Sequence, residues 1–345
     1  MRLYRFTLIL FCTLLFVAGC APGNPPSRPD DNKLTTPAEQ IDPLRQYSAV
    51  NFYLDTVVTL SAYGISSAEL NDILNTCAAY EALLSKTIPG SDVYKINHAN
   101  GRPVQVSAHT INILTAARNV SEKSGGAFDI TIGPAVNLWD FAAASIPGEA
   151  ALAAAAKLID YTKVEINGKT ARVPAGMEID LGGIAKGYIA DEIARLLMER
   201  GVTHGLLNFG GNVIVIGDKP GGTPWNVGLK DPDDLNNSFA VLPVAGCSVV
   251  TSGIYERGFD MDGVRYHHIL DAATGRPIQN GLASVTIIGK SSMLCDALST
   301  ACFALGVEDG MTLLAVYDGY EAVFMDKDRK ITATKNIAGD LIAVQ

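Results

Sequence analysis

The feature that most constrains the fold of this chain is a set of two-residue turns that contain glycine and stand between short apolar segments. Asn167-Gly168 stands between the apolar stretches of residues 164–173, and Gly210-Gly211 separates Leu206–Phe209 from Asn212–Ile216. Such dipeptides close β-hairpins because asparagine and glycine accept the positive φ angles of the turn. A hairpin pairs consecutive strands antiparallel, so the sequence predicts antiparallel sheets.

Segments with helical apolar spacing are interleaved with further strands. The expected helices cover residues 67–84, 107–124 (with Ser107 as the N-cap) and 149–159. The expected additional strands cover residues 56–63, 284–288 and 320–325. Because regular alternation of strands and helices is missing, we predict an α+β fold with antiparallel β-sheets and packed helices in a single large domain.

The first twenty residues indicate export. Arg2 and Arg5 precede the apolar run of residues 8–17, which is too short to span a bilayer and ends in Val17-Ala18-Gly19-Cys20. This ending resembles the bacterial lipobox, in which the cysteine is lipidated. We therefore expect a lipoprotein signal peptide at 1–19 and lipidation at Cys20, the alternative being an ordinary secretory peptide with an incidental cysteine.

The next stretch is poor in large apolar residues and reads as a flexible tether over residues 20–45, which leaves 46–345 for the folded domain. The expected location is the extracytoplasmic face of a bacterial membrane, held by the lipid anchor. The formal net charge is −9. An acidic chain is a poor partner for nucleic acid, which is bound through clustered Lys and Arg.

Residues 177–188 carry the first functional signal. Met177-Glu178-Ile179-Asp180 reads as a strand, Gly182-Gly183 follows, and an amphipathic helix begins near Lys186. Glycines let a backbone approach a ligand, and a helix N-terminus favours an anion. The segment matches neither the Walker nor the dinucleotide fingerprint, so a phosphate site and a plain helix start are both open.

Asp296 and Thr300 carry the second signal. They are four residues apart, so a helix places both on one face. A carboxylate beside a hydroxyl suits Mg²⁺, which keeps water and substrate oxygens in its coordination shell. The alternative is that Asp296 caps a helix and Thr300 bonds back to the backbone.

The third signal is the pair His267-His268, upstream of Thr274-Gly275-Arg276-Pro277. No third histidine or cysteine stands at metal-binding spacing, which argues against zinc. For one of the two histidines, a role in catalysis and a role in packing on a ligand ring are both open. For the other, we expect a structural role.

Together with three further blocks, these segments resemble the FAD:protein FMN transferases, the ApbE family. The resemblance spans roughly residues 50–340. Its blocks are Gly126-Ala127-Phe128-Asp129-Ile130, Asp180–Tyr188, Asn208-Phe209-Gly210-Gly211-Asn212, Thr251-Ser252-Gly253, His268–Pro277 and Asp296–Thr300.

The resemblance implies an ApbE-like, T-fold-related domain that uses Mg²⁺ and FAD as substrate. It implies transfer of the FMN moiety of FAD to a Thr hydroxyl of an acceptor protein, with release of AMP. The positions implied to hold FAD are Ala127, Phe128, Asp129, Asp180, Lys186, Ile269 and Leu270. The implied metal ligands are Gly183, Asp296 and Thr300, with Ser299 as a further contact.

Two positions depart from the family pattern. Leu54 stands where many relatives carry Met in Met-Gly-Thr, and Thr87 stands where many carry a Tyr that packs on FAD. Both positions are kept as candidate FAD contacts. The implied acceptors are exported flavoproteins such as subunits of ion-pumping redox complexes.

Three alternatives remain beside the transferase: an FAD pyrophosphatase that yields FMN and AMP, a non-catalytic FAD-binding lipoprotein and a structural lipoprotein. Asp296 and Thr300 are the candidate catalytic centre. We expect His268 to take the proton of the acceptor hydroxyl, since an unperturbed histidine titrates near neutral pH. Asp180 is the rival base.

Overall fold

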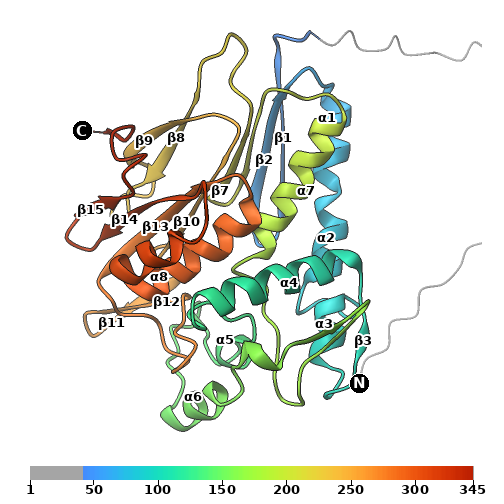
Figure 1. Ribbon diagram of the computed structural model, residues 1–345, viewed down its shortest axis with the longest axis vertical. Helices are drawn as coiled ribbons and strands as arrows, with labels where there is room; N and C mark the ends of the chain where they lie inside the picture. The colour runs from blue at the N-terminus through green and yellow to red at the C-terminus, as the bar shows by residue number, and fades with distance from the viewer. Residues whose placement is uncertain (1–41, 345) are drawn as a thin grey trace, which may run out of the picture. The chain divides into compact units, whose positions relative to one another are not determined.

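The computed structural model describes residues 42–344. The predicted signal peptide at 1–19, Cys20 and most of the predicted tether lie outside the described residues. The described chain is built on one eight-stranded sheet in which every neighbouring pair of strands is antiparallel (Figure 1). In spatial order its strands are β1 (Gln46–Tyr53), β2 (Thr56–Tyr63), β6 (Gly205–Phe209), β7 (Asn212–Ile216), β10 (Ser248–Gly253), β13 (Leu282–Gly289), β14 (Glu321–Asp326) and β15 (Ile331–Ala333).

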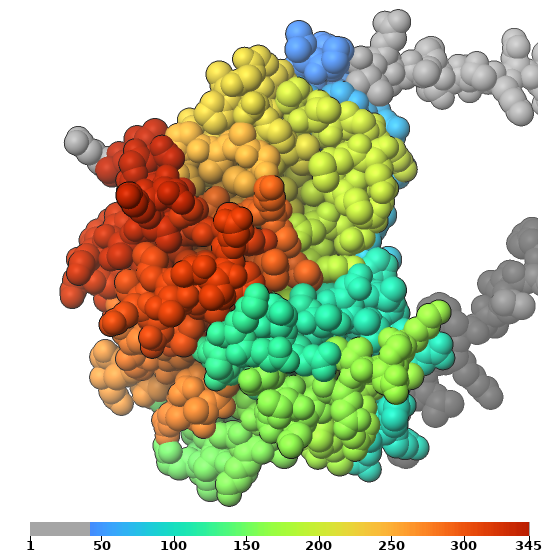
Figure 2. All heavy atoms as spheres, in the orientation of Figure 1, coloured from blue at the N-terminus to red at the C-terminus, as the bar shows by residue number. Residues whose placement is uncertain are grey.

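The helices that pack on one face of this sheet are α1 (Ser67–Asn75), α2 (Cys77–Leu84), α7 (Ala185–Glu199) and α8 (Ser292–Leu314). The others, which contact these helices, one another or the small sheets, are α3 (Asp92–Asn97), α4 (Ala108–Lys123), α5 (Gly133–Val136) and α6 (Glu149–Ala156). Helices α7 and α8 pack on the central strands and on each other. Figure 2 shows α4, in teal, lying against the orange-red α8 on the same side.

Three small sheets complete the fold. The sheet formed by β8 (Trp225–Lys230), β9 (Ser238–Val244) and β16 (Ile342–Ala343) packs on the second face of the large sheet. The other two sheets consist of β3 (Val104–Gln105), β5 (Thr170–Arg172) and β4 (Glu165–Asn167), and of β11 (Gly258–Met261) and β12 (Val264–His267).

The alternation of side chains along each strand divides the core into two layers. Leu60, Leu207 and Val250 point to the helical face and join the main core, whereas Val215 and Val249 point to the small sheet. This is the period of two that a strand buried on both faces requires. The predicted α+β class, with antiparallel sheets and packed helices, is confirmed.

Both predicted hairpins are present. The turn between β6 and β7 holds Gly210 at φ 60° and Gly211 at φ 104°. A Cβ on Gly210 would lie 2.1 Å from Oγ1 of Thr56, so only glycine fits at this position. The turn at Gly168 joins β4 to β5 in the same way.

Two local predictions were wrong. The segment predicted as one helix over 67–84 is two helices, because the chain turns at Thr76 between α1 and α2. The strand predicted to end at Asp180 is an extended loop with one isolated bridge, between Ile132 and Glu178. The side chain of Asn97 holds this loop by bonding to both the N–H (2.7 Å) and the carbonyl (2.9 Å) of Ile179.

Within the described residues, α8 is the one helix long and apolar enough to cross a membrane. However, it packs against the sheet, and many of its side chains are buried in the core. Its path is also broken at Gly306, where φ is 80°. We therefore interpret α8 as a core helix.

Candidate active site

A cleft of about 1100 Å³ opens at one end of the large sheet. Its lining comes from the β1–β2 and β6–β7 turns, the loops around 127–130 and 180–183, the first turn of α7, the loop 268–272 and one face of α8. This volume lies slightly above the usual range for small-molecule sites, about 300–1,000 Å³. The cleft is therefore a candidate binding site for a large ligand.

The close approach of α7 to α8 forms the floor of the cleft. A Cβ on Gly187 would lie 2.2 Å from the carbonyl oxygen of Ser292 and 2.8 Å from Cβ of Asp296. The Gly187 N–H donates to Oδ2 of Asp296 at 2.9 Å. Lys186, in the first helical turn as predicted, places Nζ 3.9 Å from the other oxygen, Oδ1, of the same carboxylate.

Asp296 is buried and lies in the second turn of α8, not at its N-cap. The N-cap is Ser291, whose hydroxyl accepts from the N–H of Leu294. Asp191 on α7 also accepts hydrogen bonds from Ser291 Oγ and from the N–H of Ser292, both at 2.8 Å. The start of α8 is thus fastened to α7, and this fixes where Asp296 lies.

Three hydroxyl groups line up beside Asp296. Ser252, at the end of β10, bonds to Ser299 Oγ at 2.8 Å and lies 3.4 Å from Thr300 Oγ1. Thr300 faces the cleft and shares one helix face with Asp296, as predicted, while Ser299 is fully buried behind it. A Cβ on Gly183 would lie 3.3 Å from Thr300 Oγ1, so this loop passes directly over the hydroxyl.

The carboxylate of Asp129 accepts hydrogen bonds that hold its loop in place. It accepts from the N–H and hydroxyl of Thr131, each at 2.7 Å, and from the N–H of Tyr161 at 2.9 Å. Burial raises the pKa of this carboxyl group, and the bonds from Thr131 oppose the shift. The loop thereby presents Ala127 and Phe128 to the cleft.

Asp180 forms an ion pair that sequence reasoning did not anticipate. Its Oδ2 lies 2.7 Å from Nζ of Lys86, and its Oδ1 accepts from the N–H of Gly182 at 2.7 Å. Lys86 also donates to Asn137 at 2.8 Å. The neighbouring Thr87 lines the cleft but is exposed at its edge.

Leu54 lies in the tight turn between β1 and β2, also at the cleft. Leu54 and Asp55 adopt φ angles of 55° and 56°, which residues other than glycine rarely adopt. Two contacts hold the turn: the Leu54 N–H donates to Glu81 at 3.1 Å, and Asp55 lies 3.7 Å from Arg257.

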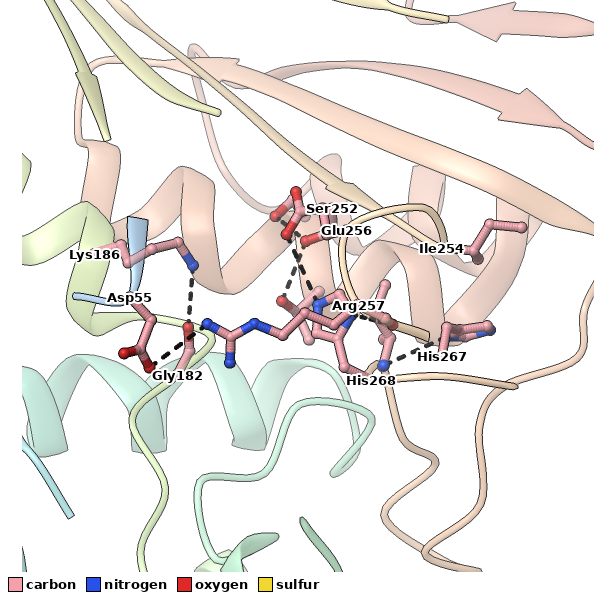
Figure 3. A network of polar contacts seen from close by, with 12 residues as sticks. Asp55, Gly182, Lys186, Ser252, Ile254, Glu256, Arg257, His267 and His268 are labelled. Carbon is pink, nitrogen blue, oxygen red and sulfur yellow. Dashed lines mark hydrogen bonds and ion pairs between the residues drawn. The ribbon is translucent and has the colours of Figure 1, made fainter. Parts of the chain in front are cut away.

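The two histidines have different surroundings. His267 is fully buried, with Nε2 2.8 Å from the carbonyl of Ile278, and burial lowers its pKa to about 4. The structural role expected for one histidine therefore fits His267. His268 faces the cleft with Nδ1 3.4 Å from the carbonyl of Arg257 and Nε2 3.9 Å from Glu256 (Figure 3).

Burial also lowers the pKa of His268 to about 4, with Lys186 acting in the same direction. The imidazole is therefore neutral at neutral pH and can accept a proton. Glu256 shows the opposite shift: burial raises its pKa, although Lys186 opposes the rise.

All but one of the candidate residues in the described chain line this cleft. The exception is Ser299, which lies behind Thr300. The residues brought together are Leu54, Thr87, Ala127, Phe128, Asp129, Asp180, Gly183, Lys186, His268, Ile269, Leu270, Asp296 and Thr300.

Sequence reasoning missed Lys86, Glu256, Arg257 and Lys230, which also line the cleft. Lys86 adjoins Thr87, and Glu256 and Arg257 closely follow the Thr251-Ser252-Gly253 block, so their neighbours offered a signal. Lys230 lies on β8, far in sequence from the other blocks, and nothing marked it.

Comparison with known proteins places this site in context. The ApbE family profile matches residues 54–324. The FAD:protein FMN transferase of Treponema pallidum is 36% identical over 319 residues, covering 85% of this chain and 88% of that protein. An FAD:protein FMN transferase of Klebsiella pneumoniae is 38% identical over 294 residues, covering 83% and 91%.

Solved structures agree with these matches. The flavin transferase ApbE from Vibrio cholerae aligns with a TM-score of 0.78 at 28% identity, covering 86% of this chain and 99% of that chain. These matches show that the chain is a transferase enzyme. Within that class, the chain belongs to the ApbE family.

Proposed function

We propose that this enzyme catalyses the Mg²⁺-dependent transfer of the FMN moiety of FAD to a threonine hydroxyl of an acceptor protein, with release of AMP. The observation that carries the proposal is the floor of the cleft. There, Lys186 lies 3.9 Å from Asp296, and Thr300 faces the same space. Above this floor are the two loops, 127–129 and 268–270, that resemble flavin-binding segments. A cation, a carboxylate and a hydroxyl beneath a large cleft suit phosphoryl transfer from a nucleotide.

The donor atoms at this floor fit Mg²⁺. Oδ1 of Asp296, the hydroxyl of Thr300 and the carbonyl of Gly183 are oxygen ligands, which this ion prefers. Across residues 42–344 there is no cluster of three or more His, Cys, Asp or Glu side chains, so the protein offers few charged ligands. Such a sparse set suits an ion that keeps waters and binds substrate phosphates. When bound, Mg²⁺ would offset the charge that develops on the phosphoryl oxygens.

The chain's own side chains supply binding and proton transfer. Lys186 is placed to bind a phosphate near the N-terminus of α7. Phe128 and the 268–270 loop offer apolar surface to the flavin nucleotide. His268 is placed to take the acceptor proton. Asp180 is the weaker candidate base, because both its oxygens are occupied by Gly182 and Lys86.

The proposal is tested by following flavin and AMP together. The purified enzyme is incubated with FAD, Mg²⁺ and membrane proteins of the source bacterium. Protein-bound flavin is detected by fluorescence after denaturing electrophoresis, and AMP by chromatography. We expect protein-bound flavin and AMP to appear together and to require Mg²⁺. AMP without protein-bound flavin would identify an FAD pyrophosphatase, and bound but intact FAD would identify a non-catalytic binding protein.

The matched variants are Asp296→Ala and Asp309→Ala, both on α8. Asp309 is an exposed carboxylate outside the cleft. Asp296→Ala should abolish transfer while the protein stays folded, because the proposed metal site loses its carboxylate. Asp309→Ala should transfer like wild type. Normal transfer by a folded Asp296→Ala protein would refute the assignment.

We also propose that the enzyme acts outside the cytoplasm, anchored by lipid at Cys20. The apolar run and the Val17-Ala18-Gly19-Cys20 sequence support export and lipidation. The proposed acceptors are exported flavoproteins, including subunits of ion-pumping redox complexes. A threonine on such a protein would reach the cleft from the same side of the membrane.

A further inference from the structure

Glu256 is an acidic group, with its side chain 32% exposed, that the proposed reaction does not yet use. It follows β10 and lines the cleft, with Oε2 3.9 Å from Nε2 of His268. A Cβ on Gly211 would lie 3.8 Å from its other oxygen, Oε1. The carboxyl group is therefore near both the β6–β7 turn and the imidazole ring, and Figure 3 shows Glu256 together with His268.

The other ring nitrogen of His268 faces a backbone acceptor. Nδ1 lies 3.4 Å from the carbonyl oxygen of Arg257, whose position is set by the His268 N–H donating to it at 3.1 Å. A carbonyl can only accept, so this contact favours the tautomer with its proton on Nδ1. Nε2 then carries the lone pair, and it is Nε2 that faces Glu256.

We propose that Glu256 is the positioning residue for His268: its carboxylate stabilises the positive charge that the ring gains on taking the proton of the acceptor hydroxyl. This inference rests on the proposed function. In the step, the hydroxyl oxygen forms a bond to the FMN phosphorus and its proton passes to Nε2. The bond from that phosphorus to the bridging oxygen breaks, and its electron pair leaves with AMP.

The space between the two groups suits a hydroxyl. An oxygen atom at hydrogen-bond distance, about 2.8 Å, from both Nε2 and Oε2 fits between atoms that are 3.9 Å apart. The acceptor hydroxyl, or the water that replaces it in hydrolysis, could therefore lie against both groups. Both side chains line the cleft, and each is about a third exposed.

The electrostatics of the two groups are complementary. Burial is the main cause that raises the pKa of Glu256 and the main cause that lowers the pKa of His268. Each charge alone is thus disfavoured, whereas an imidazolium beside a carboxylate compensates both. Other charges face the pair: Lys186 and Arg257 act on both groups, Asp296 and Lys230 on Glu256, and His267 on His268.

The test compares Glu256→Gln, Glu256→Asp and Glu122→Gln with wild type. Glu122 is an exposed residue on α4, outside the cleft, and serves as the matched control. Flavin transfer from FAD to membrane proteins of the source bacterium is measured from pH 3 to 8, a range that brackets the pKa of His268 at about 4, and FAD affinity is measured by calorimetry. The imidazole of His268 is titrated by NMR in the protein without FAD, using His268→Gln to assign its signal.

We expect Glu256→Gln to lower the maximal transfer rate about tenfold to hundredfold, less than the roughly 10²–10⁴-fold loss expected for a general base itself. FAD affinity should stay within about twofold. Loss of the carboxylate should lower the pKa of His268 by roughly one unit, so that the acid limb of the rate profile moves to lower pH. Glu256→Asp should restore part of the rate, and Glu122→Gln should match wild type.

Two results would overturn the inference. The first is a folded Glu256→Gln protein that transfers flavin at the wild-type rate. The second is a slower variant in which the His268 titration and the acid limb do not move, since Glu256 would then act through another group. If wild-type enzyme transfers no flavin, the proposed function fails, while the NMR titration still decides whether the two side chains form a pair.

Discussion

The contact between α7 and α8 allows a sharp prediction for Gly187→Ala. The new methyl carbon would lie 2.2 Å from the carbonyl oxygen of Ser292 and 2.8 Å from Cβ of Asp296. The nearer of these atoms belongs to backbone that cannot rotate away, so the two helices must separate by on the order of 1 Å to reach van der Waals contact. Alanine favours a helix by about 1 kcal/mol over glycine, but overpacking costs about 1–3 kcal/mol or more.

The expected net result is therefore a modest loss of stability and a larger loss of activity. The melting temperature should fall by several degrees, since each kcal/mol shifts a domain of this size by roughly 2–4 °C. Flavin transfer should fall about 100-fold, because Lys186 and Asp296 lie on the two separated helices and displacement by 1 Å can cost that much.

The assay combines differential scanning calorimetry with the flavin-transfer gel. Gly339→Ala is the control, because within the described part of the chain no atom lies within 4 Å of the added Cβ. Its stability should stay within about 0.5 kcal/mol of wild type. Wild-type stability and activity in Gly187→Ala would show that the helices do not meet as closely as described, and the positioning argument would fail.

Four further predictions concern single residues. Lys186→Ala should weaken FAD binding and reduce its salt dependence, and unchanged affinity in calorimetry would refute the phosphate role. His268→Ala should slow transfer by roughly 10²–10⁴-fold with little change in FAD affinity, whereas normal transfer from pH 6 to 9 would leave it a packing residue. The pKa of His267 is lowered from 6.5 to about 4, so folding favours its neutral form. As the pH falls from 6.5 to 4, the free energy of unfolding should therefore decrease by on the order of 3 kcal/mol. Denaturant titrations of His267→Gln should lack this part of the pH dependence. Cys20→Ser should leave the detergent phase on extraction, and a variant that partitions like wild type would place the anchor elsewhere.

The hairpins were predictable because their signals are local. A glycine at positive φ is required by the turn itself, so Gly168 and Gly210 mark their hairpins without reference to the rest of the fold. The N-cap of α4 at Ser107 follows the same logic, since its hydroxyl accepts from the N–H of Thr110 three residues later.

The loop before Asp180 could not be predicted as a loop because distant groups hold it. Its apolar sequence favours a strand, yet its hydrogen bonds go to Asn97, which is 82 residues away, and to Ile130. Tertiary contacts of this kind override local preference. The Lys86–Asp180 ion pair is equally invisible in the sequence, since nothing local indicates that α2 brings Lys86 to this cleft.

The candidate site was recognisable as a set of motifs before its geometry was known. Family resemblance marked Asp296 and Lys186, and helical spacing alone put Asp296 and Thr300 on one face. What the motifs could not provide was the order in space: Ser299 behind Thr300, and Glu256 opposite His268.

The ion pair of Lys86 with Asp180 means that the cleft carries its own counterion. At 2.7 Å, the ammonium group already neutralises one carboxylate on the wall where a pyrophosphate would arrive. A phosphate bound there would compete with Asp180 for Lys86, exchanging one ion pair for another instead of adding a new one. Binding of an anionic nucleotide to an acidic protein then resembles ion exchange: Lys86 gives up its ion pair with Asp180 and forms one with a phosphate of the nucleotide.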